Sequence, residues 1–132
     1  MTWFDAPLSA VLATYDADGS VRMTPVWYRP NDGAFELVIA EGDAKLRNLR
    51  RDPRCTLQVF EVVPPFRGLE ARGEAELVAG DVTEVRKDVA GRYLGAEAGA
   101  RYAAERKKPG VLVRISARPR EWDLAAILPT QA

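Results

Sequence analysis

The stretch SAVLATYDADGSVRMTPVWYR, residues 9–29, indicates the fold more directly than any other part of the chain. Residues 9–16 and 21–29 are rich in apolar and β-branched side chains, which is typical of short strands. Between them lies DADGS, residues 16–20, whose Asp-Gly pair tolerates the positive φ of a tight hairpin turn. The stretch therefore predicts two antiparallel strands. Because Pro25 has no N–H to donate, the second strand is expected at a sheet edge, or locally broken.

The remaining sequence continues this pattern of short elements. PNDG, residues 30–33, is a second turn, and further strands are expected over 34–41, 54–62, 69–78 and 109–116, with residues 120–125 as a final short strand or tail. A short helix is expected within residues 42–52. One or two helices are expected over 81–95 and 96–108, the first stretch with an apolar stripe of Val82, Val85, Val89, Tyr93 and Leu94. Short strands joined by hairpins, with helices between them, favour a small antiparallel barrel over a parallel sheet. The expected fold is mainly β, a barrel of six to seven strands with helices, in one domain over residues 1–132.

Composition limits the chemistry that the chain can perform. Its 132 residues carry 19 Lys and Arg against 19 Asp and Glu, so the basic footprint of a dedicated nucleic-acid binder is missing. The absence of histidine excludes Ser-His-Asp and Cys-His nucleophile systems and most zinc or haem ligation. The single cysteine, Cys55, excludes an intramolecular disulfide and is expected to be a buried structural thiol.

The same composition predicts where the protein works. One cysteine fits a reducing cytoplasm, and no basic segment followed by an apolar stretch opens the sequence. No run approaches the ~20 apolar residues of a membrane span. We therefore expect a cytoplasmic protein without membrane contact, and the richness in Ala, Arg, Gly and Val hints at a bacterial source.

The run AKLRNLRRDPR, residues 44–54, concentrates five basic side chains in a chain of zero formal charge. It reads as a short helix with Asp43 as N-cap. At about 100° per residue, Arg47 and Arg51 point away from the apolar face, as a solvated surface does, while Lys45 and Asn48 flank that face. A lysine in the first turn of a helix suits a phosphate, and the alternative is a lysine whose stem covers the edge of the core.

Four segments together resemble one known family. LATYDADGSVRMTPVWYR (12–29), AKLRNLRRDPR (44–54), LEARGEAELV (69–78) and VRISARPREWD (113–123) are similar to the pyridoxamine 5'-phosphate oxidase-like, FMN-binding split β-barrel superfamily. The similarity is greatest to its branch of deazaflavin (coenzyme F420)-dependent oxidoreductases and covers about residues 9–123. The combination of K-x-R-N-L-x-x-D-P-R with an upstream DG-x-x-x-x-x-P-V-W is more specific than either block alone.

The resemblance implies a Greek-key split barrel that forms a homodimer, with two cofactor sites at the dimer interface. The cofactor phosphate is expected beside Lys45, supported by Arg47 and Asn48. The ring system is expected along the second and third strands, at Met23, Thr24, Pro25, Val26, Trp27, Val38, Ile39, Ala40 and Glu41. Phe66 matches a position from which the partner subunit covers the ring. Lys107 and Lys108 match basic residues that meet the polyglutamate tail of the deazaflavin.

The chain departs from the family pattern at three points. Only eight residues precede the first expected strand, so the usual N-terminal helix is almost absent. Val38 stands where relatives often have Ser or Thr, and Asp43 stands where they have a basic or small polar residue. Asp43 would face an anionic ligand unless it turns away as a helix cap.

The first functional hypothesis is an oxidoreductase that uses bound coenzyme F420 for hydride transfer to a small conjugated or aromatic substrate. The deazaflavin performs the two-electron chemistry, so no catalytic side chain and no metal are required. Tyr28, Tyr93 and Tyr102 are candidates for a proton donor, against a packing role with a wet hydroxyl.

Three alternatives remain open. The second hypothesis is an FMN-binding oxidoreductase of the same fold, and the third is a non-catalytic protein that binds or carries a cofactor. The fourth is nucleic-acid binding through Arg47, Arg50, Arg51 and Arg54, which ranks last because the charges of the chain balance.

Overall fold

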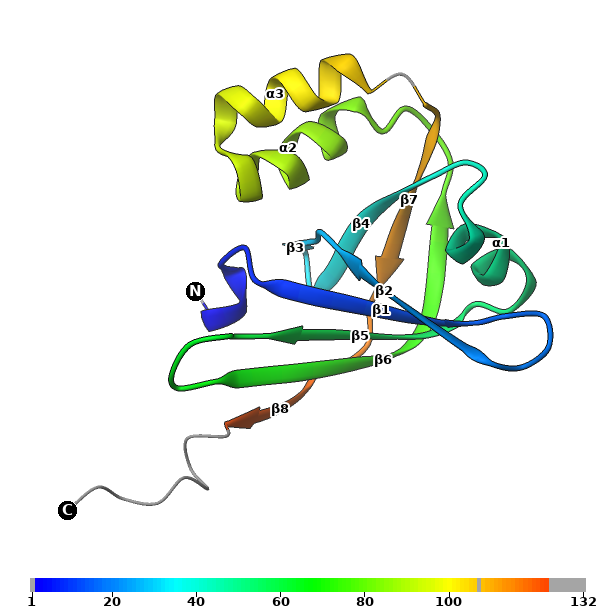
Figure 1. The fold of residues 1–132 in the computed structure, drawn as a ribbon, viewed down its shortest axis with the longest axis vertical. Helices are drawn as coiled ribbons and strands as arrows, with labels where there is room; N and C mark the ends of the chain where they lie inside the picture. The colour runs from blue at the N-terminus through cyan, green and yellow to red at the C-terminus, as the bar shows by residue number, and fades with distance from the viewer. Residues whose placement is uncertain (1, 107, 124–132) are drawn as a thin grey trace.

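The computed structural model describes residues 2–106 and 108–123. Within these ranges the chain forms eight strands, three α-helices and one short 3-10 helix (Figure 1). The strands are β1 (Ser9–Tyr15), β2 (Val21–Val26), β3 (Arg29–Asn31), β4 (Ala34–Ala40), β5 (Arg54–Phe60), β6 (Arg67–Val78), β7 (Gly110–Ile115) and β8 (Arg120–Asp123). The helices are η1 (Trp3–Asp5), α1 (Ala44–Arg51), α2 (Thr83–Leu94) and α3 (Ala96–Glu105).

The strands pair in antiparallel fashion into one sheet that curls on itself. Their order is β2-β1-β5-β6-β7-β4-β3, with β8 beside β6. β2 and β3 stand at opposite ends of this order, yet only two residues separate them along the chain, so the sheet has to curl until its ends meet. The long β6 allows this, because residues 68–74 pair with β5 and residues 75–78 pair with β7. The expected mainly β, antiparallel split barrel is confirmed.

The inside of the curled sheet is a largely aliphatic core. β1 and β5 bury every second residue, as strands with one face on a core do. Side chains that are no more than 1% exposed include Leu12, Leu37, Leu57, Leu69 and Ile115. Burying a side chain of this size contributes roughly 1.5–3 kcal/mol, so this core is the main source of the barrel's stability.

The strand expected over residues 21–29 is two strands, and this is why the sheet has eight strands instead of six or seven. β2 ends at Val26 and β3 begins at Arg29. Between them the Tyr28 ring turns into the core, where its hydroxyl donates to the backbone oxygens of Phe4 at 2.7 Å and Ala6 at 3.0 Å. Trp27 is left outside the barrel, 38% exposed. The break therefore delivers one aromatic ring to each side of the sheet.

Helix α1 confirms the expected cap and the expected solvent face. The Asp43 carboxylate accepts a hydrogen bond from the Lys45 backbone N–H at 3.0 Å, as an N-cap does. Arg47 and Arg51 are exposed, as predicted. Asn48 is buried, and its amide donates to Thr14 Oγ1 at 3.1 Å and to an Asp16 carboxylate oxygen at 2.8 Å.

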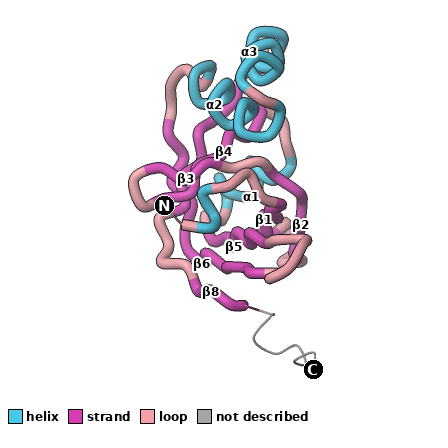
Figure 2. Tube along the Cα trace, turned by 90° about the vertical axis from the view of Figure 1, so that its left-hand side faces the viewer, coloured by secondary structure: helices cyan, strands magenta, loops and turns pink. Residues whose placement is uncertain are grey.

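Helices α2 and α3 form a hairpin that covers one end of the barrel, as Figures 1 and 2 both show. The two helices approach closely because glycines face each other: a Cβ on Gly99 would lie 2.5 Å from Gly91 Cα. The predicted apolar stripe of α2 is partly wrong. Leu94 is 44% exposed, while Arg86 takes a buried place between Val82 and Val89. The buried face of α2 thus carries a charge.

Candidate functional site

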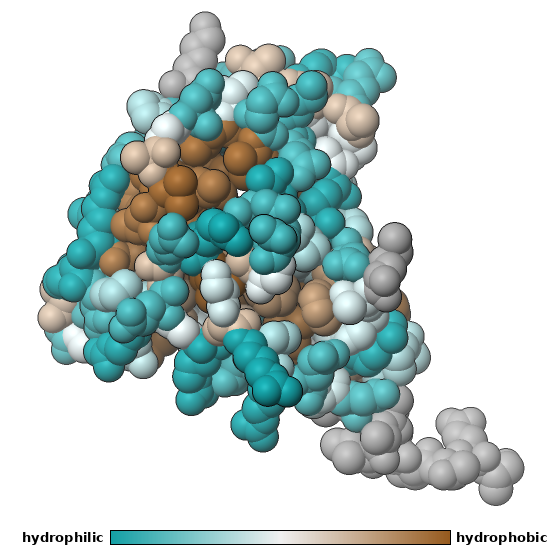
Figure 3. Space-filling model, turned by 180° about the vertical axis from the view of Figure 1, so that it is seen from behind, coloured by the Kyte–Doolittle hydropathy of each residue, from teal (hydrophilic) through white to brown (hydrophobic). Residues whose placement is uncertain are grey.

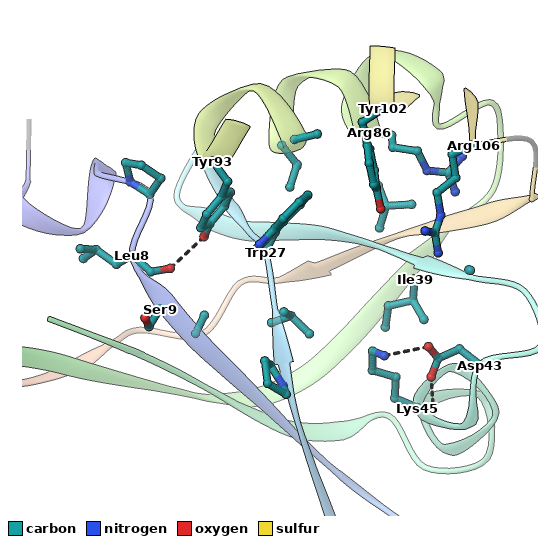
Figure 4. A pocket seen from close by; sticks show the side chains of 18 residues that line it. Leu8, Ser9, Trp27, Ile39, Asp43, Lys45, Arg86, Tyr93, Tyr102 and Arg106 are labelled. Atoms are coloured by element: carbon teal, nitrogen blue, oxygen red, sulfur yellow. Dashed lines mark hydrogen bonds and ion pairs between the residues drawn. The ribbon is translucent and has the colours of Figure 1, made fainter. Parts of the chain in front are cut away.

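A cavity of about 550 Å³ lies between the α2–α3 hairpin and the barrel (Figure 4). This volume is typical of small-molecule and cofactor sites. The N-terminal segment and the strands contribute Pro7, Leu8, Ser9, Ala10, Pro25, Val26, Trp27, Val38, Ile39 and Ala40. The three α-helices and their flanking residues contribute Asp43, Lys45, Arg86, Val89, Ala90, Tyr93, Tyr102 and Arg106. The pocket therefore combines an apolar floor with a helical roof that carries aromatic and charged groups.

Three aromatic rings form one wall of the pocket. The Trp27 and Tyr93 rings stack with centroids 5.2 Å apart and an interplanar angle of 11°, and the Tyr102 ring lies 5.6 Å from Trp27 at 55°. The Tyr93 hydroxyl donates to the Leu8 backbone oxygen at 2.9 Å, and burial raises the pKa of Tyr93. Tyr102 extends from α3 into the cavity (Figure 4). The wall offers flat surfaces against which a planar ring can pack.

Lys45 and Asp43 form an ion pair at another part of the pocket. Lys45 Nζ lies 2.8 Å from Asp43 Oδ2, and the two side chains are 17% and 33% exposed. Burial works against ionisation of Asp43, but hydrogen bonds from the Lys45 side chain and backbone and the charges of Lys45 and Lys108 lower its pKa overall. Asp43 therefore stays a carboxylate at neutral pH, and the Lys45 ammonium already has a partner.

Two arginines complete the helical side of the pocket. Arg86 is 8% exposed, and the guanidinium of exposed Arg106 lies 5.6 Å from the centroid of the Tyr102 ring. Figure 4 shows both side chains on the far side of Ile39 from Lys45 and Asp43. The pocket thus has an aromatic region and a cationic region, which suits a ligand with a flat body and an anionic group.

Seven of the thirteen predicted site residues line this pocket. They are Pro25, Val26, Trp27, Val38, Ile39, Ala40 and Lys45. Segments 25–27 and 38–40 meet there because β2 and β4 both end beneath the helical hairpin. The structure therefore brings the two expected ring-binding segments and the expected phosphate-binding lysine into one cavity.

The other six predicted residues lie outside the pocket lining. Met23 is 63% exposed on β2, and Thr24 Oγ1 is buried without a hydrogen bond to any described residue. Glu41 pairs with Arg50 at 2.7 Å. Arg47 donates to the Gly42 backbone oxygen at 2.8 Å. Asn48 is buried on the inner face of α1. Phe66 lies in the turn before β6 with a positive φ of 58°.

Two charged pocket residues, Arg86 and Arg106, were not singled out from the sequence. Arg86 carried a signal, because it follows Val82 by four residues and precedes Val89 by three, which places it on the apolar stripe of α2. Arg106 gave none, since it stands in a polar run at the end of a helix. Of the two lysines expected to meet an anionic tail, Lys108 is exposed near Gly42, and Lys107 lies outside the described residues.

The comparisons with known proteins agree on one fold family. The profile of the family described as pyridoxamine 5'-phosphate oxidase matches residues 1–124. A conserved hypothetical protein from Mycobacterium tuberculosis matches with 29% sequence identity and a TM-score of 0.77, over 98% of this chain and 86% of that one. No curated protein matches the sequence significantly.

Two further solved structures share the fold at lower identity. One is named an F420 reductase, with 22% identity and a TM-score of 0.62 over 89% of this chain and 91% of that one. The other is a FAD-binding protein from Mesorhizobium loti, with 21% identity and a TM-score of 0.64 over 89% and 85%. No helix within residues 2–106 and 108–123 is long and apolar enough to cross a membrane.

Proposed function

Since the chain belongs to the pyridoxamine 5'-phosphate oxidase family, we propose that it is an oxidoreductase that holds coenzyme F420 in the pocket beneath α2 and α3. Its substrate is a small conjugated or aromatic molecule that accepts hydride. The observation that carries this proposal is the pocket itself, in which the Trp27 wall and the Lys45 ammonium lie in one cavity of about 550 Å³. The fold that this chain shares with an F420 reductase supports the choice of cofactor.

The residues present fit a flavin or a deazaflavin. Pro25, Val26 and Ile39 give an apolar surface for a planar ring, and Trp27 can stack on its edge or face. Lys45 and the arginines of the helical hairpin supply the positive charge that a phosphate arm needs. Among the described lining residues Asp43 is the one carboxylate, and its pairing with Lys45 reduces its repulsion of that arm.

When bound, such a cofactor supplies the two-electron hydride chemistry. The chain's own groups orient the ring, exclude water from its face and hold any proton that the substrate takes up. Of the three tyrosines considered, Tyr28 and Tyr93 already donate to backbone oxygens. The Tyr102 hydroxyl makes no hydrogen bond to a residue in the described ranges and extends into the cavity, so Tyr102 is the proposed proton donor.

A second candidate cofactor is FMN, and the FAD-binding protein that shares this fold supports it. Thermal shift and calorimetric titration with coenzyme F420, FMN and haem separate these options, because a ligand of the native state raises the apparent melting temperature. We expect coenzyme F420 to bind with a micromolar Kd, and a yellow preparation with a flavin spectrum would favour FMN. Binding without turnover across a panel of acceptors would support a carrier in place of an enzyme.

The role of Lys45 is tested with matched lysine variants. Lys45→Ala removes one charge-assisted hydrogen bond to phosphate, so we expect affinity for coenzyme F420 to fall about tenfold or more. Lys87→Ala is the control, because Lys87 is exposed on α2 and does not line the pocket. An equal affinity of the Lys45→Ala variant and the control would remove Lys45 from the site.

We further propose that the protein is a homodimer whose partner subunit completes the pocket with Phe66. One face of β2 and the residue after it expose Val21 (57%), Met23 (63%) and Trp27 (38%). Apolar side chains also gather in a broad hollow area on the back of the molecule (Figure 3). Monomers rarely expose large apolar patches. Light scattering should give twice the 14.6 kDa of one chain, and Met23→Asp should shift the protein to monomer.

A further inference from the structure

Among the described residues Arg86 is a buried cation that lacks a hydrogen-bonded partner, although its charge acts on the Asp81 carboxylate through space. Its side chain is 8% exposed and lines the pocket, and its guanidinium makes no hydrogen bond or ion pair with any residue in 2–106 and 108–123. An arginine cannot lose its proton in a protein, so burial cannot be relieved by neutralisation. A buried charge without a partner lowers stability by several kcal/mol. A negatively charged ligand group that would balance the Arg86 charge can approach from the pocket.

Other inward-facing arginines of this chain show the usual arrangement. Arg29 bridges Glu36 and Asp88, each at 2.8 Å, and Arg114 lies 3.1 Å from the same Glu36. Arg92 donates to the backbone oxygens of Tyr28, Asp5 and Ala6. Each of these guanidinium groups is met by oxygen atoms from its own chain. Arg86 differs because no described oxygen atom accepts a hydrogen bond from its guanidinium, and the Asp81 carboxylate acts on it through its charge alone.

The backbone makes room for this guanidinium. A Cβ on Gly110 would lie 2.5 Å from Arg86 Nη2 and 2.8 Å from Val38 Cγ1, so only glycine leaves the space that the guanidinium occupies. Gly110 opens β7 opposite Ala40, which is itself a pocket residue. The guanidinium is thus held between α2 and the ends of β4 and β7, at a fixed place in the pocket wall.

The charges around the pocket do not balance. Among the described lining residues, Lys45, Arg86 and Arg106 are cations and Asp43 is the one carboxylate. The Asp43 carboxylate lies 2.8 Å from Lys45 Nζ and balances the charge of that lysine. The Arg106 guanidinium makes no hydrogen bond or ion pair with the described residues either, and lies over the Tyr102 ring. Two guanidinium groups on the helical side are therefore left to bind a ligand.

We propose that Arg86, with Arg106 beside it, forms an oxyanion site on the helical side of the pocket, separate from Lys45, that takes a carboxylate or phosphate group of the bound ligand. The planar guanidinium fork matches these groups with two parallel hydrogen bonds. Because the site belongs to the same pocket, the proposal rests on the proposed function and adds a second anionic group to the ligand. That group belongs either to an arm of the cofactor or to an acidic substrate.

Arg86→Met tests the site, because methionine keeps an apolar stem on α2 and removes the charge. The probes are naphthalene-2-carboxylate and its neutral amide, titrated by calorimetry. For the wild-type protein we expect the carboxylate to bind more tightly than the amide. For Arg86→Met we expect carboxylate affinity to fall about tenfold or more, since hydrogen bonds to charged groups are worth that much, while amide affinity stays unchanged.

Arg101→Met is the matched control, because Arg101 lies on the exposed side of α3, pairs with Glu97 at 3.1 Å and does not line the pocket. Arg106→Met is the second test variant. Arg106 is exposed, so the substitution removes little packing, and we expect a smaller loss of carboxylate affinity. Removal of a buried, unpaired charge should also leave the melting temperature of Arg86→Met equal to or above that of wild type.

A second pair of titrations identifies the source of the anionic group. Coenzyme F420 is compared with its deazaflavin core that lacks the phosphate and glutamates, and FMN is compared with riboflavin. Selective weakening of the complete cofactor by Arg86→Met assigns the site to a cofactor arm. Unchanged cofactor binding, with weakened binding of the naphthalene carboxylate, assigns it to an acidic substrate.

Two outcomes would overturn the proposal. Arg86→Met could bind every charged ligand as wild type does, or it could weaken charged and neutral ligands equally with a lower melting temperature, which would make Arg86 a structural residue. The proposed function fails separately, when wild type binds neither a flavin nor a deazaflavin. In that case carboxylate selectivity that depends on Arg86 would still establish the oxyanion site.

Discussion

Asp43→Asn should increase the affinity of the pocket for a phosphate-bearing cofactor. In the wild-type protein Asp43 forms an ion pair with Lys45, with 2.8 Å between Oδ2 and Nζ. Asparagine caps a helix about as well as aspartate, so α1 keeps its N-cap, and the lost ion pair is partly buried and worth on the order of 1 kcal/mol. The substitution therefore changes the charge of the pocket with little change in stability.

The magnitude follows from what Lys45 gains. The ammonium has three N–H donors, so removing the carboxylate frees a further one for a phosphate oxygen, and a hydrogen bond to a charged group contributes about 1.5–3 kcal/mol. This corresponds to roughly a ten- to hundredfold tighter Kd. The gain applies to FMN and coenzyme F420 and not to riboflavin, which has no phosphate, so calorimetric titration of both kinds of ligand measures the effect.

Asp52→Asn is the matched control for this experiment. Asp52 pairs with Arg54 at 2.7 Å at the other end of the same helix, and neither residue lines the pocket. The control should leave every Kd unchanged. An Asp43→Asn variant that is stably folded and binds FMN and coenzyme F420 no better than wild type would refute the role given to the Asp43–Lys45 pair.

Three further predictions concern the fold. Burial raises the pKa of the Cys55 thiol to about 11, so a thiol reagent at pH 8 should label Cys55 only after denaturation, and rapid labelling of the native protein would contradict its burial. Hydrogen bonds from Arg67 lower the pKa of Glu61 to about 2. This pair therefore stabilises the protein above pH ~4.5, and its contribution is lost as the pH falls toward about 2. Glu61→Gln should flatten the dependence of the melting temperature on pH between these two values. Gly99→Ala places a Cβ 2.5 Å from Gly91 Cα and should lower the free energy of unfolding by about 1–3 kcal/mol in denaturant titrations, whereas an unchanged value would show that the helices can separate freely.

Local patterns in the sequence predicted most of the barrel. The Asp-Gly turn and the alternation of β1 gave the first hairpin, and Asp43 was recognised as the cap of α1 from its position alone. The break between Trp27 and Tyr28 could not be placed in advance, because it depends on tertiary partners. The Tyr28 hydroxyl bonds to the N-terminal segment, which no local pattern predicts.

The site was less accessible to sequence reasoning than the fold. Lys45 and Asn48 look equivalent on a helical projection, yet Lys45 reaches the pocket while the Asn48 amide is held by Thr14 and Asp16 from β1 and its turn. Arg86 stood within an apolar stripe, but only the folded chain shows that no described carboxylate forms an ion pair with it. The roof of the pocket is a tertiary feature. Helices α2 and α3 lie over the ends of β2 and β4 in the folded chain, although they are distant from these strands in the sequence.

The central claim is that a deazaflavin ring binds beneath the helical hairpin against Trp27. The chain has three tryptophans, and Trp3 and Trp122 do not line the pocket, so Trp3→Phe combined with Trp122→Phe leaves Trp27 as the single reporter. We expect coenzyme F420 to quench Trp27 fluorescence with a micromolar Kd that matches calorimetry on the wild-type protein. Binding of coenzyme F420 without any change in Trp27 fluorescence, or no binding to the folded protein, would contradict the claim.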